Sequence, residues 1–183
     1  FNPFANNGIV ETQAKTCEFD EVIDCIRKMG VGEGALLVVH SSYDALASTG
    51  LSPKEIVEKL IELVGDTGTL AMPVIRHYIE EPGPTEMLHA DLGKIVCRYD
   101  VKRTVVSSGL LPMYLKKRSD AMISHHPLNP LCAVGPLAKE MMEHNLDGES
   151  PAPHGPNSSW KFCYDHNAIV LWLGVDSEHY NTM

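Results

Sequence analysis

A histidine and two serines stand where an apolar segment of the chain stops. The triplet is His40, Ser41 and Ser42. It follows the run Ala35–Val39, whose length and composition favour a buried parallel strand. Ligands of open α/β sheets usually bind outside the carboxyl ends of the strands. The triplet could therefore hold a phosphate or an amide, or it could be the polar end of a strand that caps the next turn.

Histidines form a second group that could do chemistry. His126 is the best acid–base candidate, because an imidazole titrates near neutral pH. The alternative is that His126 anchors a His-Pro turn. His125 and His154 could be imagined beside it around a metal ion, but adjacent histidines point in different directions on most backbones. The chain also has no His-x-x-x-His pair, so we expect no metal.

One sequence match suggests a phosphate loop and is better explained by a turn. The segment Arg27–Gly32 fits the pattern R-x-x-G-x-G found in acetyl-CoA loops that follow a strand and open a helix. Here the segment ends a helix and enters a strand, so the helix dipole has the wrong sign, and its glycines are typical of a helix end. The dinucleotide-binding and Walker phosphate loops are both missing from the sequence.

Alternating helices and strands must position these residues. Apolar residues at helical spacing predict a helix over residues 19–29, and Ser52 with Glu55 forms a capping box before a helix that runs to Gly65. Thr69–Met72 predicts a second buried strand, closed by Pro73. The order helix, strand, helix, strand points to a layered α/β fold.

The second half of the chain is expected to continue this pattern. Residues 76–100 are interpreted as a long connection near the site, and residues 108–117 as a helix that starts from a serine cap. Another helix is expected over Pro136–His144, and a third buried strand over Ala168–Leu173. We expect a polar N-terminal arm over residues 1–16 and a single domain over residues 17–183.

Composition excludes several classes of protein. The 183 residues are 44% hydrophobic and 21% charged, and their net charge of -9 argues against nucleic acid or an anionic membrane as the main partner. The five cysteines are scattered and include no C-x-x-C pair, so a reducing cytoplasm is the simplest location. The sequence shows no signal peptide and no apolar run long enough to span a bilayer. Its length and composition leave the oligomeric state unknown.

Several motifs, in order along the chain, resemble the aminoglycoside 3-N-acetyltransferase family. The matching segments are Leu37–Ser42, Gly65–Pro73, Tyr99-Asp100, Ser107, Gly109–Leu111, Ser124–Ala138, His154-Gly155, Ser158, Val170–Gly174 and Asn181-Thr182. The resemblance implies a layered α/β/α sandwich with a largely parallel central sheet. It also implies that acetyl-CoA donates an acetyl group to the 3-amine of the deoxystreptamine ring of a cationic aminoglycoside.

The same resemblance suggests which residues form the site. Acetyl-CoA would lie along two groups of residues, the triplet and the loops that face it: His40, Ser41, Ser42, Pro73, Val74, Thr104, Val106, Ser107 and Gly109. Thr182 would sit close to the thioester, beside His126 as a candidate for direct chemistry. Three carboxylates could face a cationic substrate: Asp100, Asp176 and Glu178.

Two departures from the family pattern leave alternatives open. The family usually has an arginine where this chain has Ile123, before the Ser124-His125-His126-Pro127 motif. The family pattern also continues after Asn-Thr into a histidine and a glutamate, so the resemblance implies a chain that lacks the C-terminal part of the family. The alternatives are an N-acetyltransferase for an amino sugar of surface polysaccharide, a metal-dependent hydrolase, or an inactive relative on the same scaffold.

Overall fold

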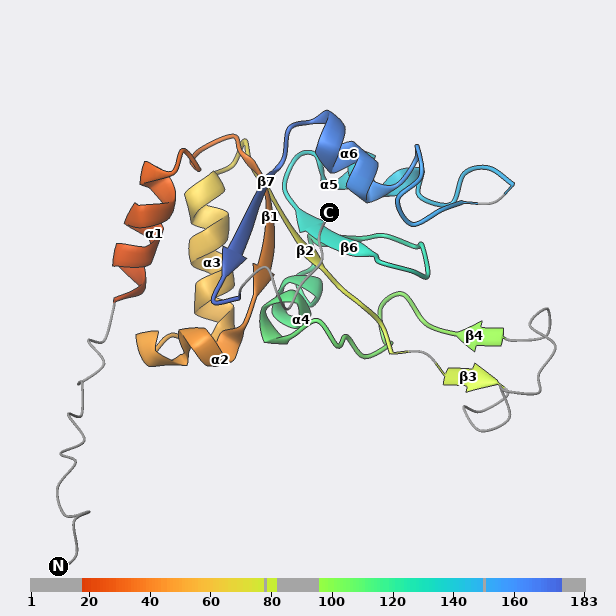
Figure 1. The fold of residues 1–183 in the computed structure, drawn as a ribbon, viewed down its shortest axis with the longest axis horizontal. Coiled ribbons are helices and arrows are strands. Elements are labelled where there is room, and N and C mark those ends of the chain that lie inside the picture. Colours follow the sequence, from red (N-terminus) through yellow and green to blue (C-terminus); the bar gives the residue numbers. More distant parts are fainter. Residues whose placement is uncertain (1–17, 78, 82–95, 150, 176–183) are drawn as a thin grey trace, which may run out of the picture.

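The computed structural model of the protein describes residues 18–77, 79–81, 96–149 and 151–175. Helices and strands alternate along most of its length (Figure 1). In chain order the elements are α1 (Phe19–Lys28), β1 (Leu36–Ser41), α2 (Tyr43–Leu46), the 3-10 helix η1 (Ala47–Thr49), α3 (Pro53–Val64), β2 (Thr69–Pro73), β3 (Ile79–Glu81), β4 (Val96–Arg98), α4 (Leu110–Lys116), β5 (Met122–Ile123), β6 (Leu131–Val134), α5 (Ala138–Glu143), α6 (Ser159–Asp165) and β7 (Ile169–Leu173).

Five of the strands form one sheet in the order β5-β6-β2-β1-β7. Strand β1 lies inside the sheet and pairs in parallel with β2 on one side and β7 on the other. Strand β6 runs antiparallel to both β2 and β5, so four of the five strands share one direction. The predicted largely parallel sheet is therefore confirmed, with β6 as the reversed strand.

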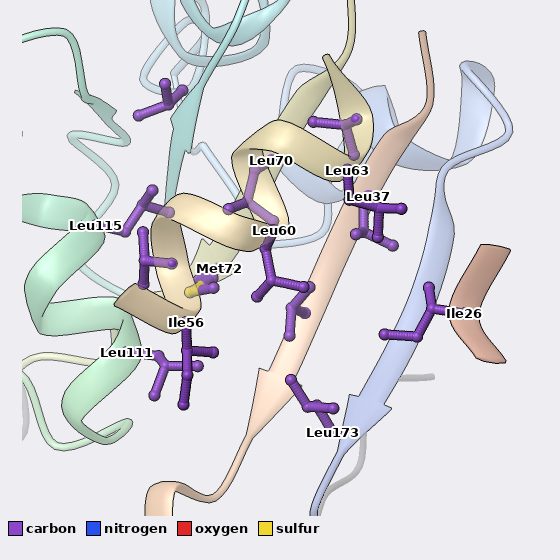
Figure 2. Packing of buried hydrophobic residues seen from close by; sticks show 14 of the residues in the cluster. Ile26, Leu37, Ile56, Leu60, Leu63, Leu70, Met72, Leu111, Leu115 and Leu173 are labelled. Carbon is purple, nitrogen blue, oxygen red and sulfur yellow. The ribbon is translucent and has the colours of Figure 1, made fainter. Parts of the chain in front are cut away.

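Helices cover both faces of this sheet. Successive residues of a strand point to opposite sides, so each strand contributes side chains to both layers. Leu37 and Val39 of β1 pack in the core formed with α1, α3 and α4, whereas Leu36 and Val38 pack against α5 and α6. Figure 2 shows the first of these cores, in which side chains of α3 lie between the sheet and α4. The predicted α/β/α sandwich is confirmed.

The first helices form where the sequence places its start signals. The Ser52 hydroxyl accepts a hydrogen bond from the backbone N–H of Glu55, and the Glu55 carboxylate accepts one from the backbone N–H of Ser52 at 2.8 Å. This capping box satisfies two N–H groups that the first turn of α3 leaves unpaired. Helix α1 carries acidic residues in its first turn and basic residues in its last, as the helix dipole favours.

Two expectations about the second half are wrong in detail. Gly109, and not Ser108, lies at the N-cap of α4, because the Ser108 hydroxyl is engaged with residues of another segment. Strand β7 is not buried: Val170 is 48% exposed and Trp172 is 38% exposed. Strand β7 pairs with β1 alone, so it forms an edge of the described sheet.

The expected connection after β2 also contains regular structure. Strands β3 and β4 form a separate antiparallel pair that projects from the main sheet (Figure 1). Helix α5 begins at Ala138, two residues after the proline expected in its first turn. None of the helices within the described ranges has both the length and the apolar character needed to cross a membrane.

Candidate active site at the carboxyl edge of the sheet

Strands β1, β2 and β7 end at the same edge of the sheet because they run in parallel. The polar triplet begins at this edge, where the backbone N–H of Ser42 donates to the carbonyl of Leu173 at 3.1 Å. Pro73 and Val74 lie at the end of the neighbouring strand and are both buried. The fold therefore places two of the expected acyl-donor segments on adjacent strands.

The third expected segment, residues 104–109, is tied to the extension of β2. The backbone N–H of Ser107 donates to the carbonyl of Ile75 at 2.8 Å, and that of His77 donates to Val105 at 2.9 Å. The Ser108 hydroxyl donates to the carbonyl of Pro73 at 2.7 Å and accepts from the N–H of Ile75 at 3.2 Å. Residues 105–107 therefore pair with residues 75–77 through a single antiparallel bridge between Arg76 and Val106.

Gly109 connects this segment to the polar triplet. Its backbone has φ +106°, a conformation that glycine adopts without strain. A Cβ atom on Gly109 would lie 3.7 Å from the carbonyl oxygen of Ser41, so the two backbones are close neighbours. All three segments expected to line the acyl-donor site therefore meet at one edge, and Thr104 is held there by a 2.7 Å hydrogen bond from Lys116 to its carbonyl.

The residues of the triplet do not share one face of the sheet. Ser41 lies in register with Leu173 on the side of α1 and α3, whereas His40 lies in register with Trp172 on the side of α6. The Ser41 hydroxyl is buried and has no hydrogen-bond partner within the described residues. Buried polar groups are rarely left unpaired, so this hydroxyl is an exception that marks the end of β1 as a candidate position for a ligand.

His126 is buried, and both of its ring nitrogens face backbone atoms. Nε2 lies 3.1 Å from the carbonyl oxygen of Pro151 and must donate to it. Nδ1 lies 3.1 Å from the backbone N–H of Leu128, which donates to it, and 2.9 Å from the carbonyl of the same residue. Neither nitrogen is directed at a substrate, so the geometry supports the anchoring interpretation over direct acid–base chemistry.

Asp100 is occupied by its own turn. Its carboxylate accepts hydrogen bonds from the backbone N–H groups of Lys102 and Arg103 at 2.8 and 2.7 Å. These two bonds hold the pKa of the Asp100 carboxyl below its usual value. The other expected substrate-facing carboxylates, Asp176 and Glu178, and the expected thioester neighbour Thr182 lie outside the described residues.

An arginine that sequence reasoning missed holds the His126 segment. Arg76 is 3% exposed, and its guanidinium donates to the carbonyls of Ser124 at 2.5 Å and His126 at 2.7 Å. The same guanidinium lies 4.9 Å from the centre of the Tyr99 ring, a cation–π distance. A cation therefore binds the segment next to Ile123, the position where the family usually has arginine. No sequence signal near Arg76 indicated this role.

Two other kinds of group, the Cys132 thiol and clusters of metal-ligand side chains, offer no reactive centre among the described residues. Burial raises the pKa of the Cys132 thiol to about 12, so it stays protonated and suits a core position. Among residues 18–77, 79–81, 96–149 and 151–175, no three His, Cys, Asp or Glu side chains gather as metal ligands would. The described residues present hydroxyl, imidazole and backbone groups at the edge.

The fold and the geometry define the chain as an α/β/α protein with a candidate hydrogen-bonding site at the carboxyl edge of its parallel strands. Comparison with known proteins identifies its family within this class. The model of the aminoglycoside 3-N-acetyltransferase family matches residues 38–183. The chain belongs to this family.

Individual relatives agree with this assignment. The chain is 27% identical over 155 residues to aminoglycoside N(3)-acetyltransferase IX of Micromonospora chalcea, covering 80% of this chain and 53% of that protein. It is 32% identical over 130 residues to aminoglycoside N(3)-acetyltransferase III of a Salmonella species, covering 68% and 46%. The chain thus spans about half the length of the curated relatives that it matches.

Solved structures share the fold. The crystal structure of the apoenzyme of aminoglycoside acetyltransferase AAC(3)-IVa superposes with a TM-score of 0.70 at 25% identity, covering 91% of this chain and 58% of that one. A binary complex of AAC-IIIb with CoASH superposes with a TM-score of 0.65 at 20% identity, covering 85% and 59%. The second likeness concerns the fold alone.

Proposed function

We propose that the protein transfers the acetyl group of acetyl-CoA to an amino group of an aminoglycoside. The observation that carries this proposal is the family match over residues 38–183. It is supported by the carboxyl edge of the sheet, where the three segments expected to line an acyl donor come together. The relatives named as aminoglycoside N(3)-acetyltransferases make the 3-amine the first position to test.

The reaction requires three contributions. The substrate ammonium must first lose a proton to a base, because only the free amine has a lone pair for attack. Its nitrogen then forms a bond to the thioester carbonyl carbon, and hydrogen-bond donors stabilise the resulting oxyanion. The carbon–sulfur bond breaks, the thiolate of CoA takes up a proton, and the nitrogen loses its remaining excess proton. No metal and no covalent enzyme intermediate is needed for this balance.

We infer that the described part of the chain serves the acyl donor and that the base comes from elsewhere. The Ser41 hydroxyl, which has no partner among the described residues, could donate to a carbonyl of the bound donor, and the strand ends of β1 and β2 hold it on rigid elements. His126 is a poor base because both of its nitrogens already face backbone atoms. Thr182 remains our candidate for a group close to the thioester.

The test is an assay for release of CoA thiol from acetyl-CoA with a panel of aminoglycosides and amino sugars. Amine-dependent release that a chelator leaves unchanged is expected, with the largest kcat/KM on a deoxystreptamine aminoglycoside. Release with amino sugars alone would shift the proposal to polysaccharide synthesis, and inhibition by the chelator would favour a metal-dependent enzyme. Binding of acetyl-CoA without transfer to any amine would identify an inactive relative.

Two serine variants show whether the carboxyl edge takes part. Ser41→Ala removes the buried hydroxyl, and the expected result is a KM for acetyl-CoA raised by about threefold to tenfold, the range of one hydrogen bond. Ser119→Ala, at an exposed serine after α4, is the matched control and is expected to leave KM unchanged. Equal behaviour of the two variants would remove Ser41 from the proposed site.

A further inference from the structure

Strand alternation separates His40 from Ser41 and places it beside α6. Its register partner in β7 is Trp172, and in parallel strands such partners point to the same face. Trp160 of α6 lies over the same face, with its ring stacked on the imidazole of His40 at a centroid distance of 6.2 Å and an interplanar angle of 22°. This distance lies within the range of favourable offset stacking.

The indole of Trp160 is fixed on its other side. Its Nε1–H donates to the carbonyl of Asn129 at 2.8 Å, and the ring of His154 lies 5.9 Å away at 46°. The side-chain amide of Asn129 lies 3.0 Å from Nε2 of His154, so the two groups that contact Trp160 also contact each other. Asn129 has φ 48°, a left-handed backbone that asparagine tolerates better than most residues.

The loops that carry these contacts are themselves tied together. His126 joins them through its hydrogen bonds to Leu128 and Pro151. His126 therefore links the two loops whose Asn129 and His154 contact Trp160, and Trp160 in turn stacks on the imidazole of His40.

From this arrangement we propose that Trp160 is a positioning residue that fixes the imidazole of His40 toward the acyl donor. This proposal rests on the proposed function for the role of the donor, but the contact itself is independent of it. Burial lowers the pKa of His40, so the imidazole is neutral at pH 7. A neutral imidazole can form a hydrogen bond with an amide group of a pantetheine chain through a ring nitrogen.

The experiment compares Trp160→Ala with Trp160→Phe in the natural full-length protein, with Tyr164→Ala as control. Tyr164 lies on the same helix and is 79% exposed, so its loss tests for a general effect on α6. Trp160→Ala is expected to raise the KM for acetyl-CoA by about two- to tenfold, the value of one stacked ring pair. The kcat and the KM of the amine should stay within about twofold. Trp160→Phe keeps a ring and should restore most of the loss.

Titration of the His40 imidazole by NMR is the second measurement, because it does not depend on turnover. Trp160→Ala exposes the ring, so the pKa of His40 should move up toward its ordinary value, while the Tyr164→Ala protein titrates as wild type. An unchanged His40 titration, an unchanged KM for acetyl-CoA or an equal fall in all kinetic constants would overturn the proposal.

The proposed function and the positioning role of Trp160 can be refuted independently. A wild-type protein that binds acetyl-CoA but acetylates no amine would refute acetyl transfer, and calorimetric Kd values of the same variants would then replace KM. A protein that does not bind acetyl-CoA at all would overturn both.

Discussion

Replacing His126 distinguishes an anchoring role from a role as general base, because the two predict different losses of stability and of kcat. His126→Ala removes a buried imidazole and leaves the carbonyl of Pro151 and the N–H of Leu128 without their partner. Each of these two groups left without its partner costs about 1–3 kcal/mol, so the free energy of unfolding should fall by about 2–6 kcal/mol. A general base contributes about 10²–10⁴-fold to the rate, whereas an anchoring residue should change kcat of the folded enzyme by less than about tenfold.

Two assays on the same variant distinguish these outcomes. Urea denaturation gives the free energy of unfolding, and the acetyl-CoA thiol assay gives kcat at a temperature where the variant is folded. His125→Ala is the matched control, because the side chain of His125 is exposed while its backbone carbonyl still accepts from Tyr99. A His126→Ala protein as stable as wild type with kcat reduced a hundredfold or more would refute the anchoring role.

Two further perturbations test the scaffold and its electrostatics. Gly135→Ala should lower the free energy of unfolding by more than about 3 kcal/mol or prevent folding, because Gly135 has φ +126° and an added Cβ would lie 2.3 Å from the carbonyl of Gly68. Gly148→Ala is the control, since Gly148 has φ +102° but an added Cβ would meet nothing within 4 Å. It should lower the free energy of unfolding by only about 1–2 kcal/mol in the same urea measurement. The pKa of Asp100 is lowered in the folded state, so its charge should stabilise the fold above about pH 4 and lose this effect as the pH falls through the lowered pKa. Wild type should therefore exceed Asp100→Asn in urea midpoint near pH 6, and the difference should disappear as the pH falls below the lowered pKa; a constant difference would contradict the assignment.

Local signals were sufficient for the first half of the fold. The capping box of Ser52 and Glu55 and the amphipathic spacing of α1 are contained within a few residues, and the structure confirms both helices. The apolar runs of β1 and β2 also lie where expected, since each is flanked by turn residues. Helix caps and apolar spacing act over one or two turns, so a single sequence reveals them.

Contacts between segments that are distant in the sequence explain why the predictions for Ser108 and for residues 168–173 are wrong. Ser108 looks like a helix cap, but Pro73 and Ile75 compete for its hydroxyl from another segment. The run over residues 168–173 is apolar enough for a central strand, but burial depends on which neighbours a strand finds, and β7 finds only β1. Strand β6 has four apolar residues between Pro130 and Gly135, too short a run to be identified before its pairing with β2 is known.

The residues of the candidate site likewise divide into those that the sequence predicts and those that only contacts between distant segments reveal. The family resemblance selected segments that the structure brings together at the edge of β1 and β2. It could not select Arg76 or Trp160, because each acts through a carbonyl or a ring that a different segment provides. Such contacts have no fixed spacing in the sequence.

The way in which residues 104–109 are held has a consequence for binding. These residues are joined to the β2 extension by backbone hydrogen bonds from Ser107 and His77 and by the bridging hydroxyl of Ser108. Gly109 then brings them against Ser41, at the end of a strand whose preceding residues are fully buried. A site built in this way is largely preformed, so little ordering cost opposes binding at this edge. If acetyl-CoA binds here as we propose, the donor has to match the positions of a few fixed groups, among them Ser41 and His40.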